Sequence, residues 1–200
     1  MFVRLLTAAL LLPFAAAPVT HHAAPAAPSV WIIDRTHSHV GFQIRHFVSR
    51  VHGVFGEFKG SIAAEDDVWQ NAQIDVEIST PSINTSSEPR DKDLKSSNFF
   101  AVDSFPVITF KSTRIERKGD DAKIYGDLGI RGVTKAVVLD GHFNGMQKAA
   151  RGDRIGFEAG TTINRLDYGV KWNRAVEGGG VMLGDEVKIE INVEAVRAKS

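Results

Sequence analysis

The chain of 200 residues contains no cysteine and no excess of charge of either sign. Without cysteine, disulfides cannot stabilise the fold, no thiol can act as a nucleophile, and no lipid can be attached to an N-terminal cysteine. The 24 basic and 24 acidic residues give a formal net charge of +0 at pH 7. This balance argues against nucleic acid and against anionic membrane surfaces as main partners.

Long apolar runs are also missing beyond the N-terminus, so no integral membrane segment is expected. Arg4 precedes the apolar run Leu5–Ala17, which is too short to span a bilayer, and small residues with two A-x-A patterns follow. We interpret residues 1–26 as a secretory signal peptide whose cleavage position the pattern leaves open, and residues 27–29 as a spacer. A buried N-terminal helix is the alternative. Residues 30–200 then form one domain, large enough to bury roughly 70% of its unfolded surface.

About eight stretches of the remaining chain alternate apolar and polar side chains. In the last stretch the two faces are Val187, Ile189, Ile191 and Val193 against Lys188, Glu190, Asn192 and Glu194. Successive side chains of an extended strand point to opposite faces, so each stretch predicts a strand with one apolar face. Closing the sheet into a barrel buries these faces and removes exposed edges. The pattern therefore predicts an all-β fold, a single antiparallel eight-stranded barrel with a short helix between strands.

Glycines interrupt the predicted apolar faces. The five positions are Gly56, Gly60, Gly126, Gly141 and Gly145. Glycine weakens a strand, and it is used either where the interior needs space or where the strand bends. Both interpretations stay open at any one site, and across five sites we expect some free volume inside the barrel.

The segment from Arg90 to Phe110 breaks the alternation. A short helix is expected from about Ser86 to Lys95, because Pro89 suits the first turn of a helix. Several aromatic residues follow it. They could plug one end of the barrel, or they could line the mouth of a cavity with Arg90 and Asp91 as its polar rim.

The sequence offers little for catalysis, and we expect neither an enzyme nor a cofactor. No Gly-x-Ser-x-Gly motif and no acid–base constellation is present. His37 and His39 have the i, i+2 spacing that places two imidazoles on one strand face, which suits zinc or copper. Further ligands are not identifiable, so we assign no metal site. A metal-dependent hydrolase or isomerase that uses His37 and His39 is the alternative function. An interaction module would need a sizeable exposed apolar patch, which the predicted outer faces lack.

Five ordered motifs between Trp31 and Ala195 resemble the YceI-like family. They are Trp31-x-x-Asp34-x-x-His37-Ser38-x-x-x-Phe42-x-x-x-His46, then Gly53-x-Phe55-Gly56-x-Phe58-x-Gly60, then Arg90-Asp91-x-x-Leu94-x-Ser96-x-x-Phe99-Phe100 with Phe105-Pro106-x-Ile108-Thr109-Phe110, then Gly126-Asp127-Leu128-x-Ile130-x-Gly132-Val133-Thr134-Lys135, and finally Ile163-Asn164-Arg165-x-Asp167-Tyr168-Gly169. The chain departs from the family at Asp93, where a histidine is usual, and at Asn98 and Ala101, where acids are usual. His39 is not part of the family pattern.

The resemblance implies an extended lipocalin-like barrel that is exported to the bacterial periplasm and holds a long polyisoprenoid chain in an apolar tunnel. We therefore expect a carrier of a polyprenyl phosphate or an isoprenoid quinone, with the oligomeric state left open and a homodimer as one option. The expected tunnel residues are Val40, Phe42, Ile44, Phe99, Phe100, Phe110, Phe143, Phe157 and Trp172. The expected polar end consists of His46, Arg90, Asn164 and Arg165, although Arg165 could instead pair with Asp167 to hold a turn.

Overall fold

The computed structural model describes residues 28–65, 69–150, 152–175 and 179–199. The predicted signal peptide, residues 1–26, lies outside the described residues. Ser29, which we assigned to the spacer, already belongs to the first strand. None of the helices in the described part of the chain is long and apolar enough to cross a membrane.

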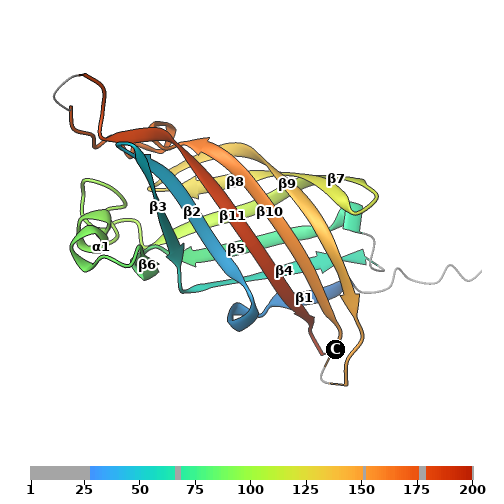
Figure 1. Cartoon of the computed structure of the whole chain (residues 1–200). Coiled ribbons are helices and arrows are strands. Elements are labelled where there is room, and N and C mark those ends of the chain that lie inside the picture. Colours follow the sequence, from blue (N-terminus) through green and yellow to red (C-terminus); the bar gives the residue numbers. More distant parts are fainter. Residues whose placement is uncertain (1–27, 66–68, 151, 176–178, 200) are drawn as a thin grey trace, which may run out of the picture.

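Eight antiparallel strands in the described residues close into a barrel (Figure 1). In ring order they are β1 (Ser29–Ile33), β4 (Phe58–Ala64), β5 (Gln73–Ser79), β7 (Val107–Lys118), β8 (Asp121–Ile130), β9 (Val133–Gln147), β10 (Arg154–Asn164) and β11 (Leu183–Arg197), which pairs again with β1. The helix α1 (Glu88–Lys95) lies between strands and carries Pro89 in its first turn. The predicted eight-stranded barrel with a short helix is confirmed.

Three more strands extend the sheet beyond β11. They are β2 (His39–His46), β3 (Ser49–Phe55) and β6 (Ile83–Asn84). The two ends of the barrel therefore differ (Figure 1). The α1 end carries α1, the β2–β3 turn and the connection from β10 to β11. The hairpin end carries the β7–β8 and β9–β10 turns and the C-terminus of the chain.

The barrel closes along one seam, where β11 meets first β1 and then β2. Residues 195–197 of β11 pair with β1, and residues 183–192 pair with β2. Between them lies the short 3₁₀ helix η1 (Arg35–His37), which interrupts the wall. Glu194 bridges the gap, because its carbonyl accepts from Asp34 N (2.8 Å) and its N–H donates to Ser38 Oγ (2.9 Å). Backbone polar groups are thus satisfied where the ladder would otherwise be broken.

An ion-pair network covers this gap from outside. The Asp34 carboxylate accepts from the Thr36 hydroxyl (2.6 Å), from His37 Nδ1 (2.9 Å) and from Arg154 Nη1 (3.1 Å). Arg154 also pairs with Glu194. The hydrogen bond from Thr36 is the largest cause that holds the pKa of Asp34 well below its usual range, followed by the one from His37. The charged form of Asp34 therefore stabilises the seam.

Four of the five glycines do not line the interior space that we expected from them. Gly56 lies in the turn between β3 and β4 and not on a strand face, so Phe55 and Phe58 on either side of the turn both point inward. A Cβ atom on Gly126 would lie 2.5 Å from Cζ of Phe110, so the phenyl ring already fills that space. Close packing of this kind lets the aromatic ring lie flat on the neighbouring strand.

Bending accounts for Gly145. Its φ of 125° falls in a region that other residues avoid, and the register of β9 against β10 shifts next to it. A β-bulge at this point increases the local twist that a closed barrel requires. Of the five glycines, Gly141 lines the cavity described below.

We predict that Asp34→Asn lowers the free energy of unfolding at pH 7 by about 1–2 kcal/mol, because it removes the charge of a carboxylate that accepts four hydrogen bonds, the fourth from the backbone N–H of Thr36. A carboxylate with a depressed pKa in the folded state stabilises the protein above its unfolded pKa of about 3.9 and loses that contribution as the pH falls. The difference between mutant and wild type should therefore shrink below about pH 4. Denaturant unfolding between pH 7 and pH 3 measures it.

The matched control is Asp75→Asn, because Asp75 forms an exposed ion pair with Lys111 at 3.1 Å. Exposed pairs contribute less than about 1 kcal/mol, so this variant should remain close to wild type throughout. Equal losses in the two variants, or a loss in Asp34→Asn that does not change with pH, would show that the network has no special role.

Candidate functional site

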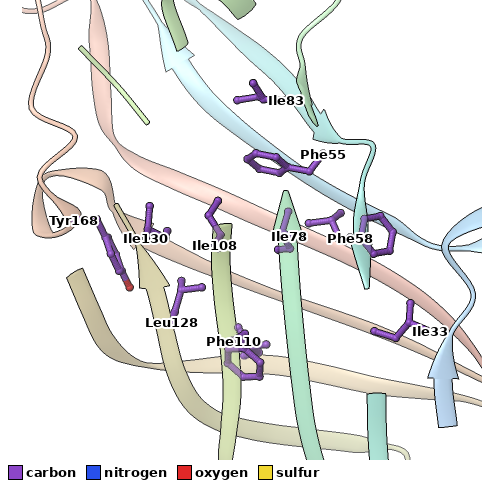
Figure 2. Close-up of a cluster of buried hydrophobic side chains, with 12 residues drawn as sticks. Ile33, Phe55, Phe58, Ile78, Ile83, Ile108, Phe110, Leu128, Ile130 and Tyr168 are labelled. Atoms are coloured by element: carbon purple, nitrogen blue, oxygen red, sulfur yellow. The ribbon is translucent and has the colours of Figure 1, made fainter. Parts of the chain in front are cut away.

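An apolar cavity of about 590 Å³ occupies the barrel interior. Its wall consists of the inward faces of the strands, and Figure 2 shows part of that wall. Among the lining residues drawn there are Phe58, Ile78, Ile108, Phe110, Leu128 and Ile130. The volume lies within the range of roughly 300–1,000 Å³ that small-molecule sites occupy. Inward-facing apolar rows therefore leave a hollow that they do not fill.

The cavity reaches both ends of the barrel. At the α1 end it is lined by Phe99 and Trp172, whose ring centroids lie 5.3 Å apart. At the hairpin end it is lined by Trp69, Phe143 and Phe157, with centroid distances between 5.1 and 6.0 Å. Since β9 and β11 each span 15 residues, the strands are about 50 Å long at roughly 3.3 Å per residue. The hollow is thus elongated along the barrel.

All nine expected tunnel residues line this cavity. They are Val40, Phe42, Ile44, Phe99, Phe100, Phe110, Phe143, Phe157 and Trp172. The segment after α1 both covers the α1 end and lines the cavity, because Phe99 is buried against Val170 and Leu183 while Phe100 packs edge-on against Phe55 at 5.9 Å. That these side chains contact a ligand stays a prediction.

Of the four expected polar-end residues, His46 and Arg90 line the cavity at the α1 end and have polar groups that a ligand could contact. His46 is the last residue of β2, and its ring meets Phe47 edge-on at 4.7 Å. Arg90 is exposed and donates from Nε to Thr85 Oγ1 (2.7 Å) and from Nη2 to the Thr85 carbonyl (2.6 Å). Among the described residues, no carboxylate oxygen lies within 4 Å of its guanidinium nitrogens. Arg90 therefore keeps its charge and further donors available.

Arg165 also lines the cavity, but its N–H groups donate to backbone carbonyl oxygens of the protein. It is buried and donates to the carbonyl oxygens of Val170 (2.6 Å), Trp172 (2.9 Å) and Gly184 (2.9 Å). Its ion pair is with Asp185 at 3.3 Å, so the expected pair with Asp167 is wrong. Burial lowers the pKa of this guanidinium, and the charge of Asp185 opposes that effect. Arg165 holds the β10–β11 connection against the barrel.

Asn164 is not among the residues that line the cavity. Its Oδ1 accepts from Leu166 N (2.9 Å) and thereby caps the 3₁₀ helix η5 (Arg165–Tyr168). We expected Asn164 at the polar end, and the structure does not place it there. The structure assigns it a local role in the turn instead.

His37 and His39 do not form a common site. His37 ends η1 and bonds to Asp34, whereas His39 begins β2 and its ring lies over Gly41. The interruption of the strand at η1 removes the shared face on which the i, i+2 argument depended. Asp34, His37 and Glu194 do converge in the described residues, but the Arg154 guanidinium already contacts both carboxylates. A fixed cation in that position favours an ion-pair network over a metal centre.

Trp69 and Arg117 are among the cavity residues at the hairpin end that sequence reasoning missed. Trp69 belongs to η3 (Trp69–Asn71), a connection outside the alternating stretches, so periodicity gave no signal for it. Arg117 lines the cavity because the register of β7 shifts between Ser112 and Arg114, which moves later odd-numbered residues to the inner face. The apolar Ile115 is the signal that could have revealed this shift.

Comparisons with known proteins agree on one family. The model of the YceI-like domain matches residues 31–195. A UPF0312 protein of Staphylococcus aureus is 39% identical over 164 residues, which cover 80% of this chain and 94% of that protein. The YceI protein of Campylobacter jejuni is 26% identical, with a TM-score of 0.65 and coverage of 78% of this chain and 90% of that one.

Two more distant structures share the fold. BcnA of Burkholderia cenocepacia has a TM-score of 0.72 at 19% identity and covers 82% of this chain and 99% of its own. A polyisoprenoid binding domain from Saccharophagus degradans has a TM-score of 0.64 at 15% identity and covers 84% of this chain and 98% of its own. The sequence match over almost the whole barrel is the decisive observation, and the chain therefore belongs to the YceI-like family.

Proposed function

We propose that this protein binds a long-chain polyisoprenoid in its barrel and carries it through the periplasm. The observation that carries the proposal is the elongated cavity of about 590 Å³, lined mostly by aliphatic and aromatic side chains between the two barrel ends. The domain from Saccharophagus degradans, which shares the fold, is described as polyisoprenoid binding. The predicted signal peptide at residues 1–26 supports the location.

The physical basis is the transfer of a hydrocarbon tail out of water. Burial is worth about 0.8 kcal/mol per methylene-sized group, so each five-carbon isoprene unit contributes roughly 3–4 kcal/mol before the entropy of binding is subtracted. A few units therefore suffice for tight binding, and more would approach the practical ceiling of affinity. Because these contacts are nonspecific, the tail sets affinity and the cavity length sets the preferred chain length.

A binding role is favoured over catalysis by the character of the wall. Ring and aliphatic carbons line most of the cavity, and such a wall can exclude water but cannot transfer protons or attack a substrate. Selectivity would then come from the polar residues at the α1 end. Arg90 suits a phosphate there, because a guanidinium forms strong charge-assisted hydrogen bonds with phosphate oxygens. A quinone head group offers only neutral carbonyl acceptors.

We predict that the protein purified from its native periplasm carries a bound lipid with an isoprenoid tail. Apolar lining of this extent is more stable when it contacts hydrocarbon than when it is empty or filled with water. Native mass spectrometry should show an adduct that organic extraction removes and tandem fragmentation identifies. Protein that is free of lipid after mild purification would contradict the carrier proposal.

Phe110→Asp should abolish uptake of a fluorescent prenyl probe while leaving the far-UV circular dichroism spectrum largely intact. Phe110 lies in the middle of the lining and is 7% exposed, so a carboxylate there would face hydrocarbon. The control is Ile32→Asp, because Ile32 is 49% exposed on the outside of β1. Undiminished uptake by a folded Phe110→Asp variant would show that the tail does not pass Phe110.

Arg90→Gln should distinguish the two head groups. If a phosphate lies at the α1 end, loss of the charge should weaken binding of a polyprenyl phosphate about 10–100-fold, since hydrogen bonds to charged groups contribute about 1.5–3 kcal/mol. Binding of an isoprenoid quinone of equal length should change less than about threefold. Lys92→Gln on the exposed side of α1 serves as the control for overall charge. Equal effects on both ligands would contradict the assignment of Arg90 to a phosphate.

A further inference from the structure

The β2–β3 turn presents apolar side chains to solvent at the α1 end. Val48 is fully exposed at its apex, and Phe47 beside it is 42% exposed. Val181, which is 41% exposed, belongs to the connection that pairs with this turn, since Phe47 N donates to the Met182 carbonyl at 2.8 Å. We call Phe47, Val48 and Val181 the apolar tip. The outer faces predicted from the sequence contained no such feature.

The structure holds the apolar tip in place. Phe47 has a φ of 51°, which is unfavourable for a residue with a side chain and persists only where its surroundings enforce it. Those surroundings are the hydrogen bond to Met182, a bond from Arg45 Nη1 to the Phe47 carbonyl (3.1 Å), and one from Ser49 Oγ to the His46 carbonyl (3.1 Å). An exposed ring in a strained, tied turn points to a surface that contacts something apolar.

Two arginines flank the apolar tip in an arrangement that does not favour folding. Arg45 and Arg50 occupy directly opposed positions on β2 and β3, where like charges destabilise a sheet. In the described part of the chain, neither guanidinium lies within 4 Å of a carboxylate. Asp185 and Glu186 lie nearby on β11, but Arg165 already binds Asp185. An anionic surface would relieve the repulsion between Arg45 and Arg50.

The apolar tip is continuous with the mouth of the cavity. His46 precedes Phe47, and Met182 follows Val181, and both of these neighbours line the cavity. If the apolar tip contacts a lipid surface, a hydrocarbon tail that leaves this surface meets cavity-lining residues that are direct sequence neighbours of the tip. This continuity distinguishes the apolar tip from isolated exposed apolar residues, because a ligand bound at the tip would lie next to the cavity.

We propose that the apolar tip docks the protein on an anionic phospholipid bilayer. Phe47, Val48 and Val181 enter the headgroup region, and Arg45 and Arg50 pair with lipid phosphates, which is how peripheral proteins combine apolar insertion with electrostatic attraction. A protein partner fits less well, because three side chains at one turn fall far short of the roughly 800 Å² per side of a stable interface. Because the net charge is zero, attraction is local and acts at contact. Only the role of docking in lipid uptake rests on the proposed function.

Vesicle flotation tests the docking directly. The purified protein should float with vesicles of phosphatidylcholine and phosphatidylglycerol and much less with pure phosphatidylcholine. Val48→Asp should reduce the bound fraction at least tenfold. The double variant Arg45→Gln/Arg50→Gln should weaken binding about fivefold per arginine on anionic vesicles only. Val138→Asp is the matched control, because Val138 is 40% exposed on β9 and should leave binding unchanged.

A second assay separates this inference from the proposed function. Val48→Asp should take up a prenyl probe from cyclodextrin like the wild type but should acquire it from anionic vesicles at least tenfold more slowly. The docking proposal would be overturned if the wild type did not float, or if Val48→Asp floated as well as the wild type. In either case, uptake from cyclodextrin would still test the carrier proposal independently. Tip-dependent flotation without any probe uptake would support the docking and reject the carrier.

Discussion

Closure of the sheet at the β1–β11 seam is the constraint on which the rest of the molecule depends. Only three residue pairs join β1 to β11, and beyond them the wall is interrupted by η1. Glu194 and Ser38 carry the hydrogen bonding across that interruption, and Asp34 with Arg154 covers it. Trp31 packs behind the seam as a fully buried side chain against Ile155 and Ala195. Without closure, the inward apolar rows would face water.

The closed wall explains why the interior is hollow. Strands of up to 15 residues enclose more volume than their own inward side chains fill, even though Phe110 and its neighbours are closely packed against the wall. Aromatic rings line both ends as well as the middle, with Phe99 and Trp172 at one end, Phe110 between, and Trp69 and Phe143 at the other end. The result is a space suited to a long, flexible and featureless hydrocarbon.

Periodicity predicted much of this arrangement, and its failures have identifiable causes. Six of the nine expected tunnel residues lie on strands, and all six line the cavity because alternation assigns an entire strand face at once. The other three, Phe99, Phe100 and Trp172, lie in connections where alternation does not apply. It failed where the inward face changes between odd-numbered and even-numbered residues. This happens at the turn that contains Gly56 and at the β7 register shift that turns Arg117 inward. It also failed for polar side chains whose partners are distant in sequence. Nothing local to Arg165 indicates that Asp185 and three carbonyl groups will bind it.

At the α1 end, the inner surface that faces the cavity and the outer surface that faces solvent carry different kinds of side chain. Arg90 and His46 face the cavity, whereas Phe47 and Val48 face outward one or two residues from His46. His46 ends β2 and lines the cavity, whereas Phe47 and Val48 form the turn beyond the strand, so this short segment contacts both the cavity and the exterior. The sequence analysis selected His46 because it belongs to the first family motif. It did not select Phe47 and Val48, which belong to none of the motifs.

The central claim is that a hydrocarbon chain occupies the barrel from end to end. A crystal structure of protein purified from its native periplasm without added lipid tests this most directly. The account predicts continuous electron density along the barrel axis between Phe99 and Trp69, with the regularly spaced methyl branches of an isoprenoid chain. Ordered water molecules in the cavity, or lining side chains collapsed into it, would contradict the account.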